Sequence, residues 1–124
     1  MKIRIRGNSI RYRLTQTEVK TLSEIGYYED STDFGDRKFI YAVKAIDDVK
    51  VLDVDFAGNA ITLYMNRDKS ITWPKSKKVG FSNVVKTKKG TSLSLLLEKD
   101  FVCMDESVED QSDNYPNPKS LINR

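Results

Sequence analysis

Residues 2–26 decide the fold, and they read KIRIRGNSIRYRLTQTEVKTLSEIG. Apolar and basic residues alternate from position 2 to position 6 and again from position 10 to position 14. A period of two is typical of a strand that buries one face, and Gly7-Asn8 between the two runs is a common turn pair. The segment therefore predicts a β-hairpin, or one long strand bent at Gly7, with an apolar face and a basic face.

The same stretch then predicts a short helix over about residues 16–24. Thr15 and Glu18 have the spacing of a capping box, in which the hydroxyl accepts a backbone N–H and the carboxylate reaches back to the cap. Apolar residues follow at every third position, as expected for a helix face that packs on a core. Gly26 supplies the left-handed residue that commonly ends a helix.

Downstream of Gly26, apolar runs alternate with turn signals, and no P-loop, dinucleotide fingerprint or internal repeat is detected. Residues 66–78 are polar around Trp73-Pro74, and we expect a loop there with at most one helical turn. Short connections between strands favour antiparallel pairing. The predicted fold class is α+β: a mainly antiparallel, strongly curved sheet or barrel of eight or nine strands with one short helix (about 16–24). The strands expected after this helix cover residues 27–34, 38–45, 49–56, 60–65, 79–85, 92–97 and 101–103.

The composition limits the chemistry that the chain can perform. Its 124 residues are 39% hydrophobic and 31% charged, which fits one globular domain over residues 1–118 with a frayed end at 119–124. One cysteine and no histidine exclude disulfide frameworks, zinc sites built from Cys and His, and His-based triads or dyads. We expect no metal site and no cofactor. The apolar runs are too short for a membrane span and the N-terminus has no signal peptide, so we expect a cytoplasmic protein that meets no membrane.

Charge is segregated along the chain. Residues 1–14 contain five basic residues and no acid. If the two strands pair, these cations share one sheet face, where they repel unless acids or a bound anion lie between them. Guanidinium groups match the geometry of phosphate and carboxylate, so this face is the candidate anion-binding site; the alternative is a solvent-exposed face neutralised by acids from residues 29–36 or the C-terminal tail. The candidate residues are Lys2, Arg4, Arg6, Arg11 and Arg13.

A second basic stretch runs from position 67 to position 89, with Trp73 and Phe81 among lysines. Aromatic rings between cations could stack on bases while the cations contact phosphates. Lysines at strand edges and hairpin tips also prevent edge-to-edge aggregation, and the pI of about 8.9 falls short of a typical basic domain. We therefore do not expect nucleic acid as a partner.

Residues 104–118 contain five acids and no base, followed by a rigid apolar end with Tyr115, Pro116 and Pro118. The acids complement the basic N-terminal strands, and an aromatic anchor resists fraying. We expect this tail to be ordered and to fold back over the basic sheet. Oxygen-rich segments also bind calcium or magnesium, but the EF-hand spacing is absent.

Several segments resemble a family of small bacterial proteins of unknown function. They include KIRIRGNSIR at residues 2–11, the run from Leu14 to Glu18, and Val79-Gly80-Phe81. The other two are EKDF at residues 98–101 and the closing EDQSDNYPNP at residues 109–118, which is the most specific part. The resemblance covers most of the chain. It implies a stand-alone bacterial cytoplasmic protein and supplies no activity.

The spacing of the N-terminal basic residues is also similar to that of the CYTH superfamily of triphosphate-tunnel proteins. The resemblance implies a closed antiparallel barrel whose tunnel is lined by Arg and Lys, with acids that hold a metal. Those proteins begin with alternating glutamates, whereas residues 1–14 of this chain contain no acid.

Together these observations lead us to expect a non-enzymatic binding or accessory module. Its basic sheet face would meet an anionic small molecule or an acidic protein. A metal-dependent phosphohydrolase of the triphosphate-tunnel type is the alternative, and a purely structural or self-assembling protein is the second alternative. The orientation of the arginines separates the first two, since a tunnel would enclose them and a binding face would expose them. The sequence leaves the oligomeric state open.

Overall fold

The computed structural model describes residues 1–102 and 111–116. These residues form eight strands, two short α-helices and one 3-10 helix. The strands are β1 (Lys2–Arg6), β2 (Ser9–Leu14), β3 (Tyr27–Asp33), β4 (Lys38–Ile46), β5 (Leu52–Ala57), β6 (Ala60–Asn66), β7 (Gly80–Lys86) and β8 (Ser92–Lys99). The helices are α1 (Gln16–Ile25), α2 (Arg67–Thr72) and the 3-10 helix η1 (Trp73–Lys75).

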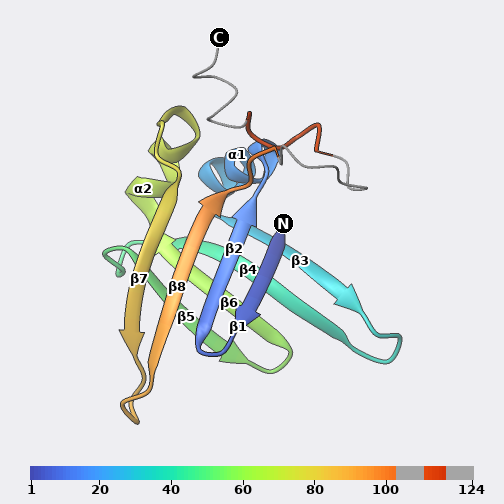
Figure 1. Ribbon diagram of the computed structural model, residues 1–124, viewed down its shortest axis with the longest axis vertical. Helices are drawn as coiled ribbons and strands as arrows, with labels where there is room; N and C mark the ends of the chain where they lie inside the picture. The colour runs from blue at the N-terminus through green and yellow to red at the C-terminus, as the bar shows by residue number, and fades with distance from the viewer. Residues whose placement is uncertain (103–110, 117–124) are drawn as a thin grey trace.

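The strands form two four-stranded sheets that pack face to face, with their strands crossing at an angle (Figure 1). Sheet A has the order β1-β2-β8-β7, and sheet B has the order β3-β4-β6-β5. In each sheet two antiparallel hairpins meet through a parallel central pair, β2 with β8 and β4 with β6. The α+β class is confirmed, and of the eight or nine expected strands the described residues form eight. The expectation of a single curved sheet or barrel was wrong, because the described strands make two separate sheets.

All four hairpins form where the turn signals predicted them, as β1-β2, β3-β4, β5-β6 and β7-β8. The strand ends differ by a few residues, since β5 begins only at Leu52 and β8 continues to Lys99. The parallel pairs were not predicted, because they join hairpins that lie far apart in the chain and leave no local signal in the sequence. Both helices lie at the end of the sandwich opposite the hairpin turns (Figure 1).

The two halves of the chain share one plan, which corrects the expectation of no internal repeat. The first half runs β1-β2-α1-β3-β4, and the second runs β5-β6-α2-β7-β8. Each sheet takes one hairpin from each half. The registers correspond as well, since Tyr12 lies opposite Leu97 across the central pair of sheet A and Leu63 lies opposite Val43 across that of sheet B. The fold is therefore a structural duplication around an approximate twofold relation.

The sequence trace of this duplication is faint. The turns of β1-β2 and β5-β6 are both Gly-Asn, and Gly7 and Gly58 have φ angles of 54° and 57°, which favour glycine. Elsewhere the halves keep the burial pattern and little else. The equivalent inward residues of β2 and β6 are Ile10, Tyr12 and Leu14 in one and Ile61, Leu63 and Met65 in the other.

The core lies between the inner faces of the two sheets. Tyr12 of β2 is fully buried, and its hydroxyl donates to the Ile61 carbonyl of β6 at 2.8 Å. Its ring meets Tyr41 of β4 edge-on, with the ring centroids 6.4 Å apart. At one side of the sandwich, Asn83 Nδ2 of β7 donates to the Leu52 carbonyl of β5 at 2.9 Å. These contacts fix the two sheets relative to each other.

Helix α1 confirms the predicted capping box. Glu18 Oε1 accepts from the Thr15 N–H at 2.8 Å, and Thr15 Oγ1 accepts from the Glu18 N–H at 3.4 Å. Gly26 ends the helix with φ 82°. The other oxygen of Glu18, Oε2, lies 2.5 Å from the α-ammonium of Met1. One buried carboxylate thus caps the helix and holds the start of β1.

The loop expected over residues 66–78 is instead α2 followed by η1. The Asn66 side chain caps α2 by accepting from the Lys69 N–H at 3.2 Å. Trp73 is 1% exposed, and its indole N–H donates to the Lys78 carbonyl at 2.9 Å. The prediction was wrong because burial of a single tryptophan draws this polar segment onto the core, whereas the segment itself carries no apolar stripe.

Residues 111–116 of the tail lie against α1 and the end of β8. The Asp113 carbonyl accepts from the Gln16 N–H at 3.0 Å, and the Tyr115 N–H donates to the Asp100 carbonyl at 2.8 Å. Tyr115 also packs against the core cluster. For this part of the tail the predicted order is confirmed, but the contact is with the start of α1 and not with the basic sheet face.

The remaining tail predictions concern residues 104–110 and 117–118, and the predicted frayed end concerns residues 119–124. All of them lie outside the described residues.

Replacing Thr15 with Ala should lower the free energy of unfolding by about 1 kcal/mol, because the Glu18 N–H loses its acceptor. Denaturation in urea measures the change. Thr21→Ala is the matched control, since Thr21 lies inside the same helix and its hydroxyl only bonds back to the Thr17 carbonyl. Equal effects of the two substitutions would show that the cap contributes nothing specific.

Replacing Tyr115 with Ala should cost about 2 kcal/mol of stability, roughly half of what a fully buried ring contributes, because this ring is only partly buried. Tyr115→Phe keeps the ring and should preserve most of that stability. Asp113→Asn removes only a charge at the start of α1 and should cost about 0.5 kcal/mol. If Asp113→Asn destabilised the protein more than Tyr115→Ala, the tail would be held by charge and not by its aromatic anchor.

Candidate functional site

The five predicted site residues lie together on the outer face of sheet A, which we call the basic face. Strands β1 and β2 pair antiparallel, so Lys2 lies opposite Arg13 and Arg4 lies opposite Arg11. Four of the five cations line a shallow pocket of about 310 Å³. Arg6, at the end of β1, is opposite Ser9 and completes the set. The structure therefore brings the candidate residues into one site.

Acids from β8 and the residue after it neutralise part of this charge. Glu98 Oε1 accepts from Arg11 Nε at 2.5 Å and lies 3.4 Å from Arg13 Nε. Asp100, which is almost fully buried, places Oδ2 3.2 Å from Lys2 Nζ. These acids were missed from the sequence, where neutralisation was expected from residues 29–36 or the tail. The charged run Glu98-Lys99-Asp100 after three leucines was the available signal, but its position depends on the parallel pairing of β8 with β2.

Gly80 helps to place Glu98. The two residues are opposite each other across β7 and β8. A Cβ atom at Gly80 would lie 2.3 Å from the Leu97 carbonyl oxygen and 2.7 Å from Glu98 Cβ, closer than real atoms approach. Glycine thus permits β7 to run close beside Glu98, which in turn holds Arg11 and Arg13.

Arg4 and Arg6 differ from the other three cations. Both side chains are exposed, and within residues 1–102 and 111–116 neither forms an ion pair or a side-chain hydrogen bond. Along β1, Arg4 lies between Lys2, which has an acidic partner, and Arg6. The basic face therefore has a neutralised part at Lys2, Arg11 and Arg13 and, as far as the described residues show, an unneutralised part at Arg4 and Arg6.

The basic face is open to solvent and does not line an enclosed tunnel. It belongs to the outside of one sheet of a sandwich, and Arg11 and Arg13 keep 32% and 35% of their side-chain surface exposed. This orientation separates the binding-module hypothesis from the tunnel hypothesis and favours the first. Across the described ranges, no three His, Cys, Asp or Glu residues are grouped so as to hold a metal ion.

The second basic stretch has no exposed aromatic platform. Trp73 and Phe81 are buried core residues whose rings meet edge-on, with centroids 5.2 Å apart. Neither ring is accessible for stacking on a base.

None of the helices in the described part of the chain has the length and apolar character that a membrane crossing requires.

Lys99 is a buried cation that sequence reasoning did not single out. It is 5% exposed, and its Nζ donates to the Ser76 carbonyl at 2.6 Å. The ammonium lies 5.0 Å from the centre of the Tyr115 ring and 6.0 Å from that of Trp73. Burial lowers the pKa of Lys99. The contacts join η1, β8 and the tail, so we interpret Lys99 as a structural residue.

A family model described as "Family of unknown function (DUF7009)" matches residues 1–119. The chain belongs to this family. The resemblance to a family of unknown function is thus confirmed, whereas the resemblance to the CYTH superfamily is not supported. No curated protein and no solved structure matches the chain. Any functional hypothesis for this family member therefore depends on the geometry of its own residues.

The buried tyrosines and Lys99 should change the stability of the protein in opposite directions as the pH rises above neutral. Burial raises the pKa of Tyr28 and of Tyr115 to about 12, and it raises that of Tyr12 further. The folded state keeps these phenols protonated, so their contribution to stability is present below pH 10 and is lost as the pH rises from 10 through 12. The lowered pKa of Lys99 acts in the other direction, since its burial costs less as the pH rises toward 10.5.

We therefore expect the urea midpoint to rise slightly up to about pH 10 and to fall steeply above it. Lys99→Met should remove the rise, and Tyr115→Phe should reduce the fall, because each substitution removes the titrating group. Thr21→Ala, which removes no titrating group, is the control and should leave the shape of the profile unchanged. A wild-type profile that stays flat to pH 12 would contradict the assignment.

Proposed function

We propose that the protein is a binding module whose basic face takes an anionic ligand that carries phosphate or carboxylate groups. The ligand is a small polyanion or an acidic segment of another protein. Within the described residues the face offers four guanidinium groups, one ammonium group and two carboxylates that are already engaged with them, so we assign it recognition and no catalysis. The open position of the array supports this hypothesis over a tunnel enzyme.

The direct pairing of cations across β1 and β2 is the observation that carries the proposal. Arg4 lies opposite Arg11, and Lys2 lies opposite Arg13. Like charges at opposite positions destabilise a pair of strands, so a sheet selected only for stability would gain from an acid or a neutral residue at position 4. An anion placed between these side chains converts the repulsion into charge-assisted hydrogen bonds. Arg4 is available for this role, because within the described residues it contacts no acid.

Glu98 partly neutralises the arginines of the site and therefore affects how an anion can bind there. Its carboxylate contacts both Arg11 and Arg13, and only 14% of its side chain is exposed. Without a ligand it holds the two guanidinium groups in place and limits their repulsion. Toward an incoming anion it is a competitor, because it already occupies donors that the anion would use. The face should therefore prefer ligands with several charges, which engage Arg4 and Arg6 together with the free donors of Arg11 and Arg13.

Tripolyphosphate should stabilise the protein at constant ionic strength, by about 2.7 kcal/mol when it is present at 100 times its dissociation constant. Arg4→Ala should weaken its binding at least tenfold, because it removes a charge-assisted contact. Titration calorimetry and thermal unfolding measure the two effects. Lys89→Ala, on the hairpin tip beyond β7, is the matched control for loss of one exposed cation and should change binding less than twofold.

Equal stabilisation by chloride at the same ionic strength would show screening alone and would end the proposal. So would equal losses in Arg4→Ala and Lys89→Ala, since they would reflect net charge and not a site.

Glu98→Gln provides a second and stricter test. The substitution keeps the shape of the side chain but releases both arginines from their counter-charge. We expect tripolyphosphate to bind several-fold more tightly, while the ligand-free protein loses about 1 kcal/mol of stability. Weaker binding would mean that Glu98 only orders the arginines and does not compete with the ligand, which would contradict the proposed balance.

A further inference from the structure

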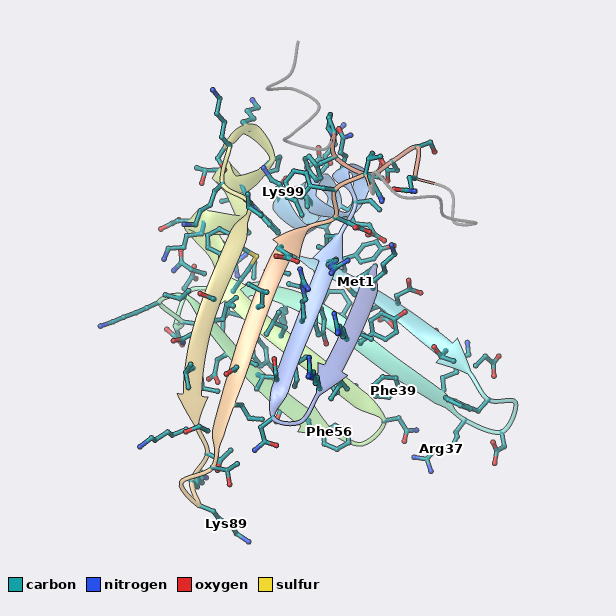
Figure 2. All side chains as sticks on the ribbon, in the orientation of Figure 1. Met1, Arg37, Phe39, Phe56, Lys89 and Lys99 are labelled. Atoms are coloured by element: carbon teal, nitrogen blue, oxygen red, sulfur yellow. The ribbon has the colours of Figure 1, made fainter. Side chains whose placement is uncertain are left out.

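The inner face of sheet B continues beyond the part that sheet A covers. Figure 1 shows β3 and β4 running past β1 toward their shared turn, where no strand of sheet A lies over them. Apolar residues are exposed at this end: Phe34 is 67% exposed and Phe56 is 72% exposed. Figure 2 shows Phe39, Phe56 and Arg37 gathered at this same end of the molecule. The fold therefore leaves part of an apolar sheet face without a covering layer.

These residues line a pocket of about 420 Å³, the size of a small-ligand site. Its floor is aromatic, because Phe34, Phe39 and Phe56 all contribute to it. Phe39 stacks in a tilted geometry on Tyr41, with ring centroids 6.0 Å apart, so the floor is continuous with the core. The floor of the pocket is thus continuous with the hydrophobic core and is not an isolated surface depression.

Two hairpin turns are bonded to each other at the rim of this pocket. The Ile40 N–H donates to the Asn59 carbonyl at 2.8 Å, which ties the start of β4 to the turn before β6. The Arg37 guanidinium donates to Asn59 Oδ1. Since a guanidinium has five N–H donors and this bond uses one, Arg37 is held in place with donors to spare.

The residues that line the pocket carry a net positive charge, although Asp33 lies opposite Lys38 just outside it. Arg37 and Lys38 line the pocket together with a single acid, Asp36. The neighbouring Asp33 accepts the Gly35 N–H at 2.8 Å within its own turn. Within the described residues, neither rim cation forms an ion pair. An aromatic floor beside free cationic donors suits a ligand that is apolar at one end and negative at the other.

On the opposite side of the sandwich, the edge strands of the two sheets are in contact. There β5 and β7 meet, and Asn83 bonds to the Leu52 carbonyl. Because the two halves share one plan, β1 and β3 are the equivalent pair of edges, and toward their turns they diverge (Figure 1). Phe34 therefore lies on the open side of the sandwich, and Phe56 joins it from the end of β5.

We propose that this pocket binds single amphiphiles, with an alkyl chain on the aromatic floor and an anionic carboxylate or phosphate head at Arg37 and Lys38. A second copy of the chain is a poorer occupant, because a twofold contact through this face would bring two sets of rim cations together. A concave site with one cationic side also fits one ligand better than a flat bilayer surface. The site is separate from the basic face, which lies on the outside of the other sheet.

Titration calorimetry with sodium dodecanoate below its critical micelle concentration tests the proposal. Dodecanoate should bind one molecule per chain, while acetate, which has the head without the tail, should not bind. Phe56→Ser should weaken dodecanoate binding at least tenfold. Ile25→Ser is the matched control, because Ile25 is also 72% exposed but lies at the end of α1, and it should have no effect. Both side chains are largely exposed, so thermal unfolding should show that both variants remain folded.

Arg37→Gln tests the recognition of the head group. It should weaken dodecanoate binding at least threefold and leave binding of the neutral dodecyl maltoside unchanged. Lys88→Gln, in the turn between β7 and β8 and outside the pocket, is the control and should affect neither. Equal affinity for dodecanoate and dodecyl maltoside would overturn the assignment of the rim. Absence of dodecanoate binding would overturn the whole proposal. So would a dimer in sedimentation velocity that Phe56→Ser dissociates, or binding to phosphatidylglycerol vesicles without binding of the single amphiphile, since each identifies a different occupant.

Discussion

Contact between the two sheets through Tyr12 is the interaction on which the rest of the structure depends. Its ring fills the space between β2 and sheet B, and its hydroxyl reaches the backbone of β6 at Ile61. A buried phenol without a partner would be costly, so this bond sets the distance and the offset between the sheets. The position of Tyr12 has consequences at both candidate sites. Because Tyr12 points into the core, the basic residues that alternate with it point outward to solvent, and the offset leaves the far end of sheet B uncovered.

The duplicated plan explains how one small chain acquires two unlike surfaces. The buried positions of the two halves correspond, because both must fill the same space between the sheets. The outward positions are free of that constraint. On β1 and β2 they are basic, whereas the equivalent outward positions on β5 include Asp53 and Asp55. Packing thus preserves the interior of the repeat, and the exposed faces diverge enough to hide the repeat from the sequence.

Local features of the fold could be predicted from the sequence, and features of its assembly could not. The capping box at Thr15 and the Gly-Asn turns involve residues a few positions apart, so their chemistry can be recognised directly. The parallel pairing of β2 with β8 joins segments more than eighty residues apart, and only the complete core selects it. The same limit applies to the candidate site. The five cations follow from the alternation in β1 and β2, but their counter-charge Glu98 arrives through the parallel pair and was missed.

Each of the two proposed sites carries an energetic or solubility cost for the protein, and the two costs differ in kind. The basic face retains opposed cations, and Glu98 and Asp100 reduce that cost without removing it, because Arg4 and Arg6 stay outside their reach. The apolar pocket retains exposed phenylalanines, a cost in solubility and not in folding, since an exposed ring contributes little to the stability of the folded chain. A site maintained against electrostatic repulsion implies a charged ligand, and a site maintained against exposure to water implies an apolar one. The two kinds of cost therefore point to different ligand chemistries, even though both sites contain arginine.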